Sequence, residues 1–194
     1  MQLKISTNDL AEMILENAFP ENYHDISSAV TERTTHLENG LGKGTYREVF
    51  FEGIHIAYGD MRFRKETELL FESDYETVEM HFDLCGNSLM NISGRNGYAY
   101  EFSTNRHNIV YMPGIKGTIC FGMSSARMLE INLVPSLFTK YLRDTETYDA
   151  FLKLIKNQSP ALLGKHNMPI TPAMQHIINA IIGVSADVAQ PERK

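Results

Sequence analysis

The sequence predicts a mainly β protein, an antiparallel sandwich or barrel, followed by helices. Short strands succeed one another from Tyr46 to Leu133 at a spacing of roughly ten residues, and turn residues separate them. After Val134-Pro135 the apolar spacing changes from two residues to three or four. With 194 residues, 43% hydrophobic and 22% charged, the chain is long enough for one well-packed domain.

The first expected element is a short helix over residues 6–18. Apolar residues recur there at helical spacing, namely Leu10, Met13 and Ile14, and Thr7 or Asn8 can cap the start. Phe19-Pro20 ends this helix. Residues 21–44 are mixed and polar, and they close with a glycine-rich turn at 39–44.

The strands expected next are bounded by Gly, Pro, Asn, Asp and Ser. They are Tyr46–Glu52, Ile54–Arg64, Glu66–Ser73, Thr77–Cys85, Leu89–Ile92, Gly97–Phe102, Asn108–Met112, Gly117–Phe121 and Arg127–Leu133.

Three helices are expected after the strands: Pro135–Arg143, Glu146–Asn157, and one that starts at Thr171-Pro172 and can end at Gly183. The last helix carries an apolar stripe of Met174, Ile177, Ile178, Ile181 and Ile182. This stripe is either a core-packing face or a dimer seam. A complete barrel leaves little core to cover, so a dimerisation interface is favoured.

Composition excludes several classes of protein. No apolar run approaches the ~20 residues that span a bilayer, and the polar start does not read as a signal peptide. Only Cys85 and Cys120 are present, so no disulfide framework is expected, and a cytoplasmic location follows. The net charge is −6 with scattered Lys and Arg, which disfavours nucleic-acid binding by this chain alone.

The strand Thr77–Cys85 is the most informative stretch. Apolar residues alternate with polar ones, and Gly86 stops the pattern. In a barrel, Glu79, His81 and Asp83 would share the inward face and form a polar pocket, whereas in a plain sheet they would form a solvated face. The two readings are about equally favoured.

Strand phase extends the candidate ligand-binding set. By the same alternation, Glu130 and Asn132 are expected to line the pocket. Tyr58 and Arg62 can line it from the second strand, whereas His55 is expected to be exposed. Two carboxylates and a histidine favour hydroxyl- or amine-bearing ligands over simple anions.

Part of the cupin motif surrounds Glu79. A Glu followed six residues later by Gly86 resembles the first motif of cupins, the double-stranded β-helix barrels of jelly-roll type, and Tyr111–Gly114 resembles the front half of the second. The His-x-His of the first motif and the His of the second are missing. A metal site needs three or four converging ligands, so no metal, cofactor or catalytic residue is expected, and the chain is predicted not to be an enzyme.

Several segments together resemble the N-terminal effector-sensing domain of AraC-family transcriptional regulators. These segments are Glu48–Ile56, Phe71–Phe82, His107–Tyr111, Leu129–Leu133, Pro135–Phe138 and Lys165–Ile170. The resemblance implies a cupin-like ligand-sensing barrel with an N-terminal helical segment over residues 1–134. It also implies a helical, dimerising segment over 135–183 and a tail or linker over 184–194.

The family's two helix-turn-helix motifs have no counterpart after Ile182, where too few residues remain. The chain is therefore expected to be part of a longer protein or to have lost its DNA-binding half. The predicted function is to bind a small-molecule effector, form a homodimer and act on DNA only through the missing half, with no membrane partner. Two alternatives remain: a cupin-type enzyme, either an isomerase or a metal-dependent oxygenase, and a pure interaction module.

Overall fold

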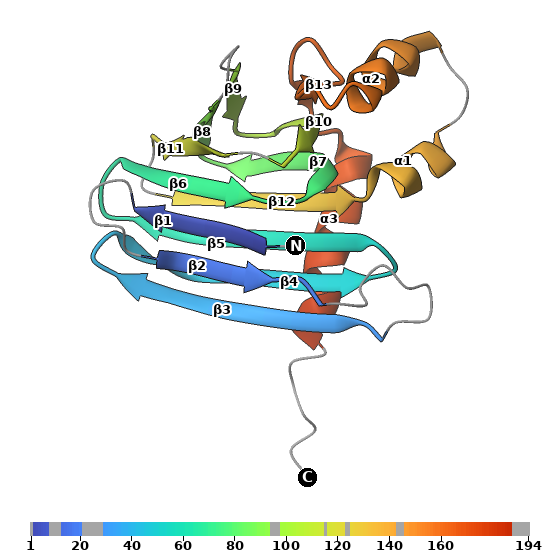
Figure 1. Cartoon of the computed structure of the whole chain (residues 1–194). Coiled ribbons are helices and arrows are strands. Elements are labelled where there is room, and N and C mark those ends of the chain that lie inside the picture. The colour runs from blue at the N-terminus through green and yellow to red at the C-terminus, as the bar shows by residue number, and fades with distance from the viewer. Residues whose placement is uncertain are drawn as a thin grey trace.

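Two antiparallel sheets lie face to face and make up most of the molecule (Figure 1). The computed structural model describes residues 2–7, 13–20, 29–93, 98–114, 116–122, 125–142 and 146–187. The six-stranded sheet has the order β2-β1-β6-β11-β8-β9, and the eight-stranded sheet has the order β13-β10-β7-β12-β5-β4-β3, with β14 paired to β10.

The six-stranded sheet consists of β1 (Gln2–Thr7), β2 (Met13–Ala18), β6 (Thr67–Ser73), β8 (Asn87–Ile92), β9 (Tyr98–Ser103) and β11 (Lys116–Phe121). The eight-stranded sheet consists of β3 (Thr31–Asn39), β4 (Gly42–Phe51), β5 (Ile54–Phe63), β7 (Glu76–Cys85), β10 (Arg106–Pro113), β12 (Ser125–Leu133), β13 (Ala161–Leu162) and β14 (Met168–Pro169). The helices are α1 (Pro135–Tyr141), α2 (Glu146–Lys156) and α3 (Pro172–Asp187).

The strands from β5 to β12 pair in a nested order. β5 pairs with β12, β6 with β11, β7 with β10, and β8 with β9. A long hairpin folded back on itself in this way gives a jelly roll, the architecture of cupins. The fold is of the cupin type, as the sequence predicted.

All nine strands predicted between Tyr46 and Leu133 are present, with ends shifted by four residues or fewer. The glycine that stops the pattern of β7 is required by its geometry. Gly86 has a φ of 92°, and a Cβ there would lie 2.5 Å from the carbonyl oxygen of Ser125.

The predicted N-terminal helix over 6–18 is wrong, because the described residues on either side of 8–12 form strands β1 and β2. Gln2 pairs with Ala18, and β1 also pairs with β6. Leu3 and Ile5 face the space between the sheets, while Lys4 forms an ion pair with Glu16 (Nζ–Oε1 3.2 Å). Pairing on both sides of β1 gives its backbone N–H and C=O groups hydrogen-bond partners. This pairing makes the strand more stable than a short isolated helix would be.

Strand β3 was also missed. Its sequence, residues 31–39, is polar, and the buried-and-polar alternation of an inner strand is lacking because β3 lies at the end of the eight-stranded sheet.

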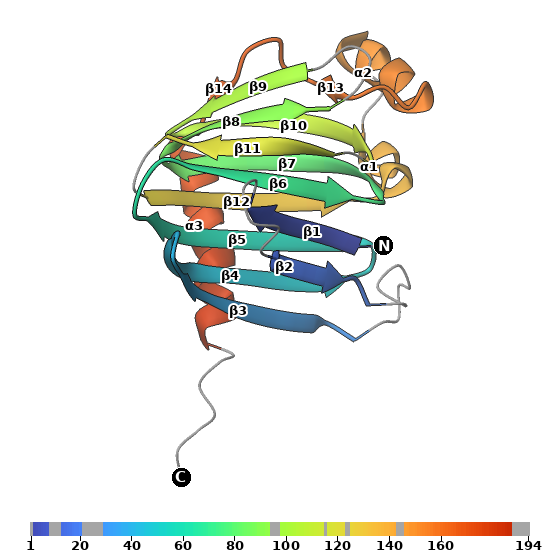
Figure 2. The same cartoon turned by 60° about the vertical axis from the view of Figure 1, so that its left-hand side comes forward.

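Helix α3 crosses the outer face of the eight-stranded sheet, as both views show (Figures 1 and 2). Ile178 is fully covered there by Phe82 and Leu129. The helix continues past the predicted end at Gly183 to Asp187.

Helices α1 and α2 cover another part of the same face, with Phe138 and Phe151 in one cluster with Val78 and Tyr111. The sheet is therefore covered on both faces. None of the helices in the described residues combines the length and apolar character needed to cross a membrane.

Candidate ligand and metal site

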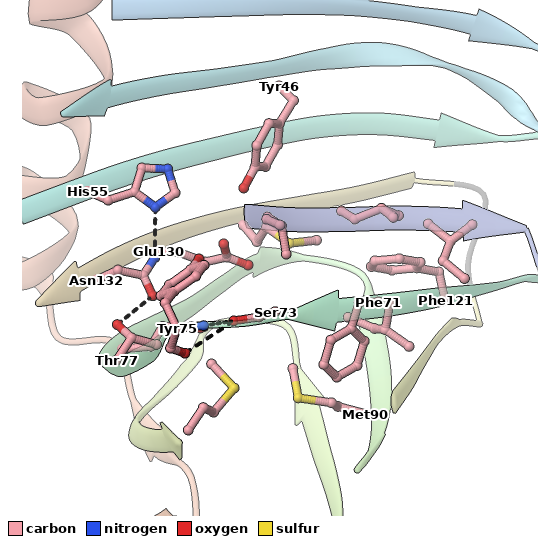
Figure 3. Close-up of a pocket in the computed structure, with 17 residues that line it drawn as sticks. Tyr46, His55, Phe71, Ser73, Tyr75, Thr77, Met90, Phe121, Glu130 and Asn132 are labelled. Atoms are coloured by element: carbon pink, nitrogen blue, oxygen red, sulfur yellow. Dashed lines mark hydrogen bonds between the residues drawn. The ribbon is translucent and has the colours of Figure 1, made fainter. Parts of the chain in front are cut away.

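A cavity of about 130 Å³ lies between the two sheets (Figure 3). Its two halves differ in chemistry. Its apolar half is lined by side chains that include Leu69, Phe71, Met90, Ile119, Phe121 and Met128. Its polar half is lined by Tyr46, His55, Ser73, Tyr75, Thr77, Glu79, Glu130 and Asn132.

The polar half is built from the two central strands β7 and β12. Thr77 and Glu79 project from β7 and Glu130 and Asn132 from β12, and the pairing sets Glu79 opposite Asn132 and His81 opposite Glu130. Because side chains at every second position share a face, this register collects the polar groups on the inner side.

His81 lies between two carboxylates. Its Nδ1 donates to Oε1 of Glu79 at 2.7 Å, and its Nε2 lies 3.3 Å from Oδ2 of Asp83. All three residues are buried. Burial alone would lower the pKa of His81, but Asp83 and Glu79 outweigh it and hold that pKa well above its usual value. His81 is therefore an imidazolium near neutral pH.

Glu130 completes the cluster. Its Oε1 lies 3.9 Å from Nδ1 of His81. Burial and the nearby Glu79 raise the pKa of Glu130 to about 8, although His81 opposes the shift. Burial and the nearby Glu130 also raise the pKa of Tyr46, so its hydroxyl stays protonated. The cluster holds more acidic groups than cations to balance them.

A second polar chain reaches the cavity from β4 and β5. Nε2 of His55 lies 3.2 Å from Oε1 of the buried Glu48, and Nε of Arg33 lies 3.8 Å from Oε2 of the same carboxylate. Nδ1 of His55 lies 3.5 Å from Nδ2 of Asn132, and Thr77 donates to Oδ1 of Asn132 at 3.3 Å. Figure 3 shows the last two contacts as dashed lines, one joining His55 to Asn132 and one joining Asn132 to Thr77.

The structure brings together five of the seven predicted ligand-binding residues: Glu79, His81, Asp83, Glu130 and Asn132. Glu79, Glu130 and Asn132 line the cavity directly, whereas His81 and Asp83 stand behind Glu79. Their role in binding a ligand stays a prediction.

Tyr58 and Arg62 do not join them. Tyr58 packs against the cluster under α3, and Arg62 is exposed. The phase assumed for β5 is wrong, since the inner residues of this strand are His55, Ala57 and Gly59. His55, expected to be exposed, is 1% exposed and belongs to the polar half of the cavity.

Sequence reasoning also missed Tyr46 and Glu48 as inner residues of β4. The signal that could have found them is the alternation of Tyr46, Glu48 and Phe50 on one face of that strand. Cys85 and Cys120 are free and half-buried.

The predicted dimerisation stripe mostly meets the chain's own sheet. Met174, Ile181 and Ile182 are half-buried against the same cluster as Ile178, and Ile177 alone of the five is largely exposed, at 58%. Dimerisation through this helix stays a prediction.

Three groups of the cluster suit a divalent cation. One ligand atom each from Glu79, His81 and Glu130 lies within 4.8 Å of the others. Carboxylate and imidazole donors in such a set are those that zinc, manganese and iron accept in proteins. To serve as a ligand, His81 must first lose the proton that it now shares with Glu79.

No protein-family model and no curated protein matches the chain. Among solved structures, the AraC-like transcriptional activator CuxR is similar at 10% identity and a TM-score of 0.41, covering 83% of this chain and 53% of its own. Oxalate decarboxylase of Bacillus subtilis is similar at 17% identity and a TM-score of 0.39, covering 90% and 43%. HppE in its FeII form is similar at 10% identity and 0.41, covering 56% and 62%.

This chain therefore spans less than two thirds of the length of each of these structures. Similarity at these identities concerns the fold and does not assign a function.

The prediction that the chain is not an enzyme is wrong. It depended on the cupin histidines that are missing from both motifs, but the structure assembles a candidate metal site from Glu79, His81 and Glu130, which those motifs do not describe. Enzymatic activity therefore stays open for this chain.

Proposed function

We propose that this chain is the effector-sensing domain of an AraC-type regulator and binds a small molecule in the cavity between its sheets. One observation carries the proposal: strands β7 and β12 line the cavity on one face and hold α3 on the other. Glu130 faces the cavity, while its neighbour Leu129 is fully buried under α3.

This arrangement gives a ligand a direct mechanical route to the helix. A ligand that draws Glu79 and Glu130 together shifts two paired strands, and Phe82 and Leu129 on their outer faces move with them. A shift of α3 follows only if the ligand binds one arrangement of strands and helix better than the other.

The remaining features of the proposal come from the resemblance to AraC-family regulators. The sensing part covers residues 1–134, although its N-terminal segment is a strand pair, not a helix. Residues 135–183 form a homodimer in the cytoplasm, residues 184–194 serve as a linker, and DNA is bound only through a helix-turn-helix half outside this sequence.

Hydrogen–deuterium exchange with and without a ligand tests this route. A thermal-shift screen of small molecules first finds a ligand, and exchange is then measured for α3 in wild type and in Leu129→Ala. A ligand that slows exchange in both β12 and α3 of wild type supports the proposal. Protection confined to the cavity strands, with α3 unchanged, contradicts a sensing role.

A metal-dependent cupin enzyme is the second candidate, favoured by the grouping of Glu79, His81 and Glu130. A divalent ion held there would act as a Lewis acid on a substrate oxygen. Native mass spectrometry with metal analysis on freshly purified protein separates the candidates. One metal per chain, lost in Glu79→Gln and kept in the exposed variant Glu32→Gln, favours the enzyme. An organic mass without metal favours the sensor.

A further inference from the structure

We infer that the cavity accepts a small organic cation: a primary ammonium group at the polar end, joined to an apolar body the size of a benzene ring. The inference rests on the proposed function, because it specifies the ligand of the same cavity.

The charges around the polar end leave an anionic excess. Glu79 and Asp83 face a single cation, His81, whose nitrogens lie 2.7 and 3.3 Å from their oxygens. Glu130, 3.9 Å from Nδ1 of His81, adds a third carboxyl group, and its pKa of about 8 keeps it largely protonated at pH 7 until a cation enters. Glu48 is paired separately, with Nε of Arg33 at 3.8 Å and Nε2 of His55 at 3.2 Å. No Lys or Arg is among the described residues that line the cavity. A buried carboxyl group either keeps its proton or needs a cation to balance its charge, so a cationic ligand is favoured here and an anionic one is disfavoured.

The hydrogen bonding at Glu130 indicates a ligand independently of charge. No residue in the described ranges donates a hydrogen bond to its carboxylate, although Glu130 lines the cavity. A carboxyl group inside a folded protein without a hydrogen-bond donor is rare unless a further partner binds it.

An ammonium group supplies what this end lacks. It carries three N–H donors and no acceptor. The carboxylates of Glu79 and Glu130 and the side-chain oxygen of Asn132 are acceptors that line the same end. A hydroxyl group has one donor and could bind only one of these acceptors at a time.

The size and lining of the cavity define the rest of the ligand. A cavity of about 130 Å³ is close to the ~150 Å³ apolar cavity that holds a benzene molecule in another protein. Its far half presents Phe71, Met90 and Phe121. This half can contact the apolar body of a ligand, but it offers no ligand atoms to a bare metal ion.

Three probes of the same shape and different charge test the inference: benzylamine, benzyl alcohol and benzoate. Binding of each is measured by titration calorimetry at pH 7 on the full chain after removal of metals with a chelator. We expect benzylamine to bind at least tenfold more tightly than benzyl alcohol, and benzoate not to bind.

The variant Glu130→Gln removes one carboxylate and keeps its shape, and Glu32→Gln on the exposed face of β3 is the matched control. We expect the preference for benzylamine over benzyl alcohol to fall to less than threefold in Glu130→Gln and to persist in the control. Circular dichroism on each variant confirms that it is folded.

The opposing outcomes separate the two proposals. Equal or tighter binding of benzyl alcohol or benzoate overturns the cationic ligand but keeps a small-molecule cavity. Binding of Mn²⁺ that Glu130→Gln abolishes, without a preference for benzylamine, overturns it in favour of a metal site. Absence of binding by all three probes and by Mn²⁺ overturns the inference, whereas the proposed function is decided separately by the small-molecule screen and the exchange measurement.

Discussion

At the scale of single residues, the inner carboxylates and His81 determine how the protein responds to pH. Glu130 has its pKa raised from 4.5 to about 8. The folded state therefore holds this proton more tightly than the unfolded chain, and the stability that results is complete below about pH 4.5 and is lost as the pH rises toward 8. The pKa of His81 is also raised. The contribution of His81 to stability is present below pH 6.5 and is lost as the pH rises through its folded-state pKa. Both groups therefore make the folded state less stable in alkaline solution.

Glu130→Gln removes one of these titrations. We expect the variant to be more stable than wild type at pH 9 by about 1–2 kcal/mol, or roughly 2–8 °C in melting temperature, because the buried charge is absent. At pH 5 we expect little difference, since Glu130 is then protonated in the folded state. Thermal denaturation at both pH values measures this. Glu32→Gln is the control, and a stabilisation that is equal at both pH values would contradict the assigned pKa.

At the scale of elements, the eight-stranded sheet has no solvent-facing side along its central strands. Each of these strands presents polar groups to the cavity and apolar groups to the helices. In β12, Glu130 and Asn132 face inward, while Leu129 and Ile131 face α3. The stability of α3 therefore depends on strand residues that lie next to the cavity.

Leu129→Ala and Ile177→Ala test which face of α3 is covered. Leu129 is fully buried, so its truncation should cost about 2–5 kcal/mol. Ile177 is 58% exposed, so its truncation should change the unfolding free energy by less than about 0.5 kcal/mol. Urea denaturation gives both values. A large, concentration-dependent cost for Ile177→Ala would show instead that a second copy covers this face.

Asn108 connects β10 to the segment between β13 and β14. Its Nδ2 donates to the carbonyl oxygen of Gly164 (3.0 Å) and to Oδ1 of Asn167 (2.9 Å), and its Oδ1 accepts from the amides of Gly164 and Ile109. Asn108→Ala should cost about 1–3 kcal/mol, because buried backbone groups lose their partner.

Limited trypsin digestion reports on this connection. The exposed Lys165 should be cut faster in Asn108→Ala than in wild type. Asn157→Ala, a change of an exposed residue in another loop, should leave the rate unchanged. Equal cutting in all three proteins would show that Asn108 does not hold the segment.

At the scale of the whole molecule, the nested pairing determines how the chain folds. β5 pairs with β12, and β6 pairs with β11, so the first strands of the jelly roll form their pairs only with strands far away in the sequence. Closing such long loops before their contacts form slows folding.

We expect refolding to take milliseconds to seconds. Stopped-flow tyrosine fluorescence measures it, since the chain has nine tyrosines and no tryptophan. A microsecond phase that carried the full amplitude would contradict the nested order as the rate-limiting feature. Ile178→Ala serves as an internal reference, because the buried Ile178 belongs to α3, outside the nested strands, and its truncation should mainly speed unfolding.

The sequence alone determined the strands from β4 to β12 and the three helices, because turn residues and apolar spacing are local signals. It also identified Glu79, His81, Asp83, Glu130 and Asn132 as candidates, since they alternate with apolar residues. The strand pair β1–β2 was missed because its pairing with β6 is a contact with a distant segment, which outweighs the helical spacing of its apolar residues.

Only the tertiary structure decided which face of each strand is inside. An apolar face usually marks the interior, but here the helices bury the apolar faces on the outside and the cavity holds the polar ones. The same inversion placed His55 inside and Tyr58 and Arg62 outside, against the sequence-based phase. Local alternation fixes the spacing of the two faces, whereas the elements that cover each face fix which one meets a ligand.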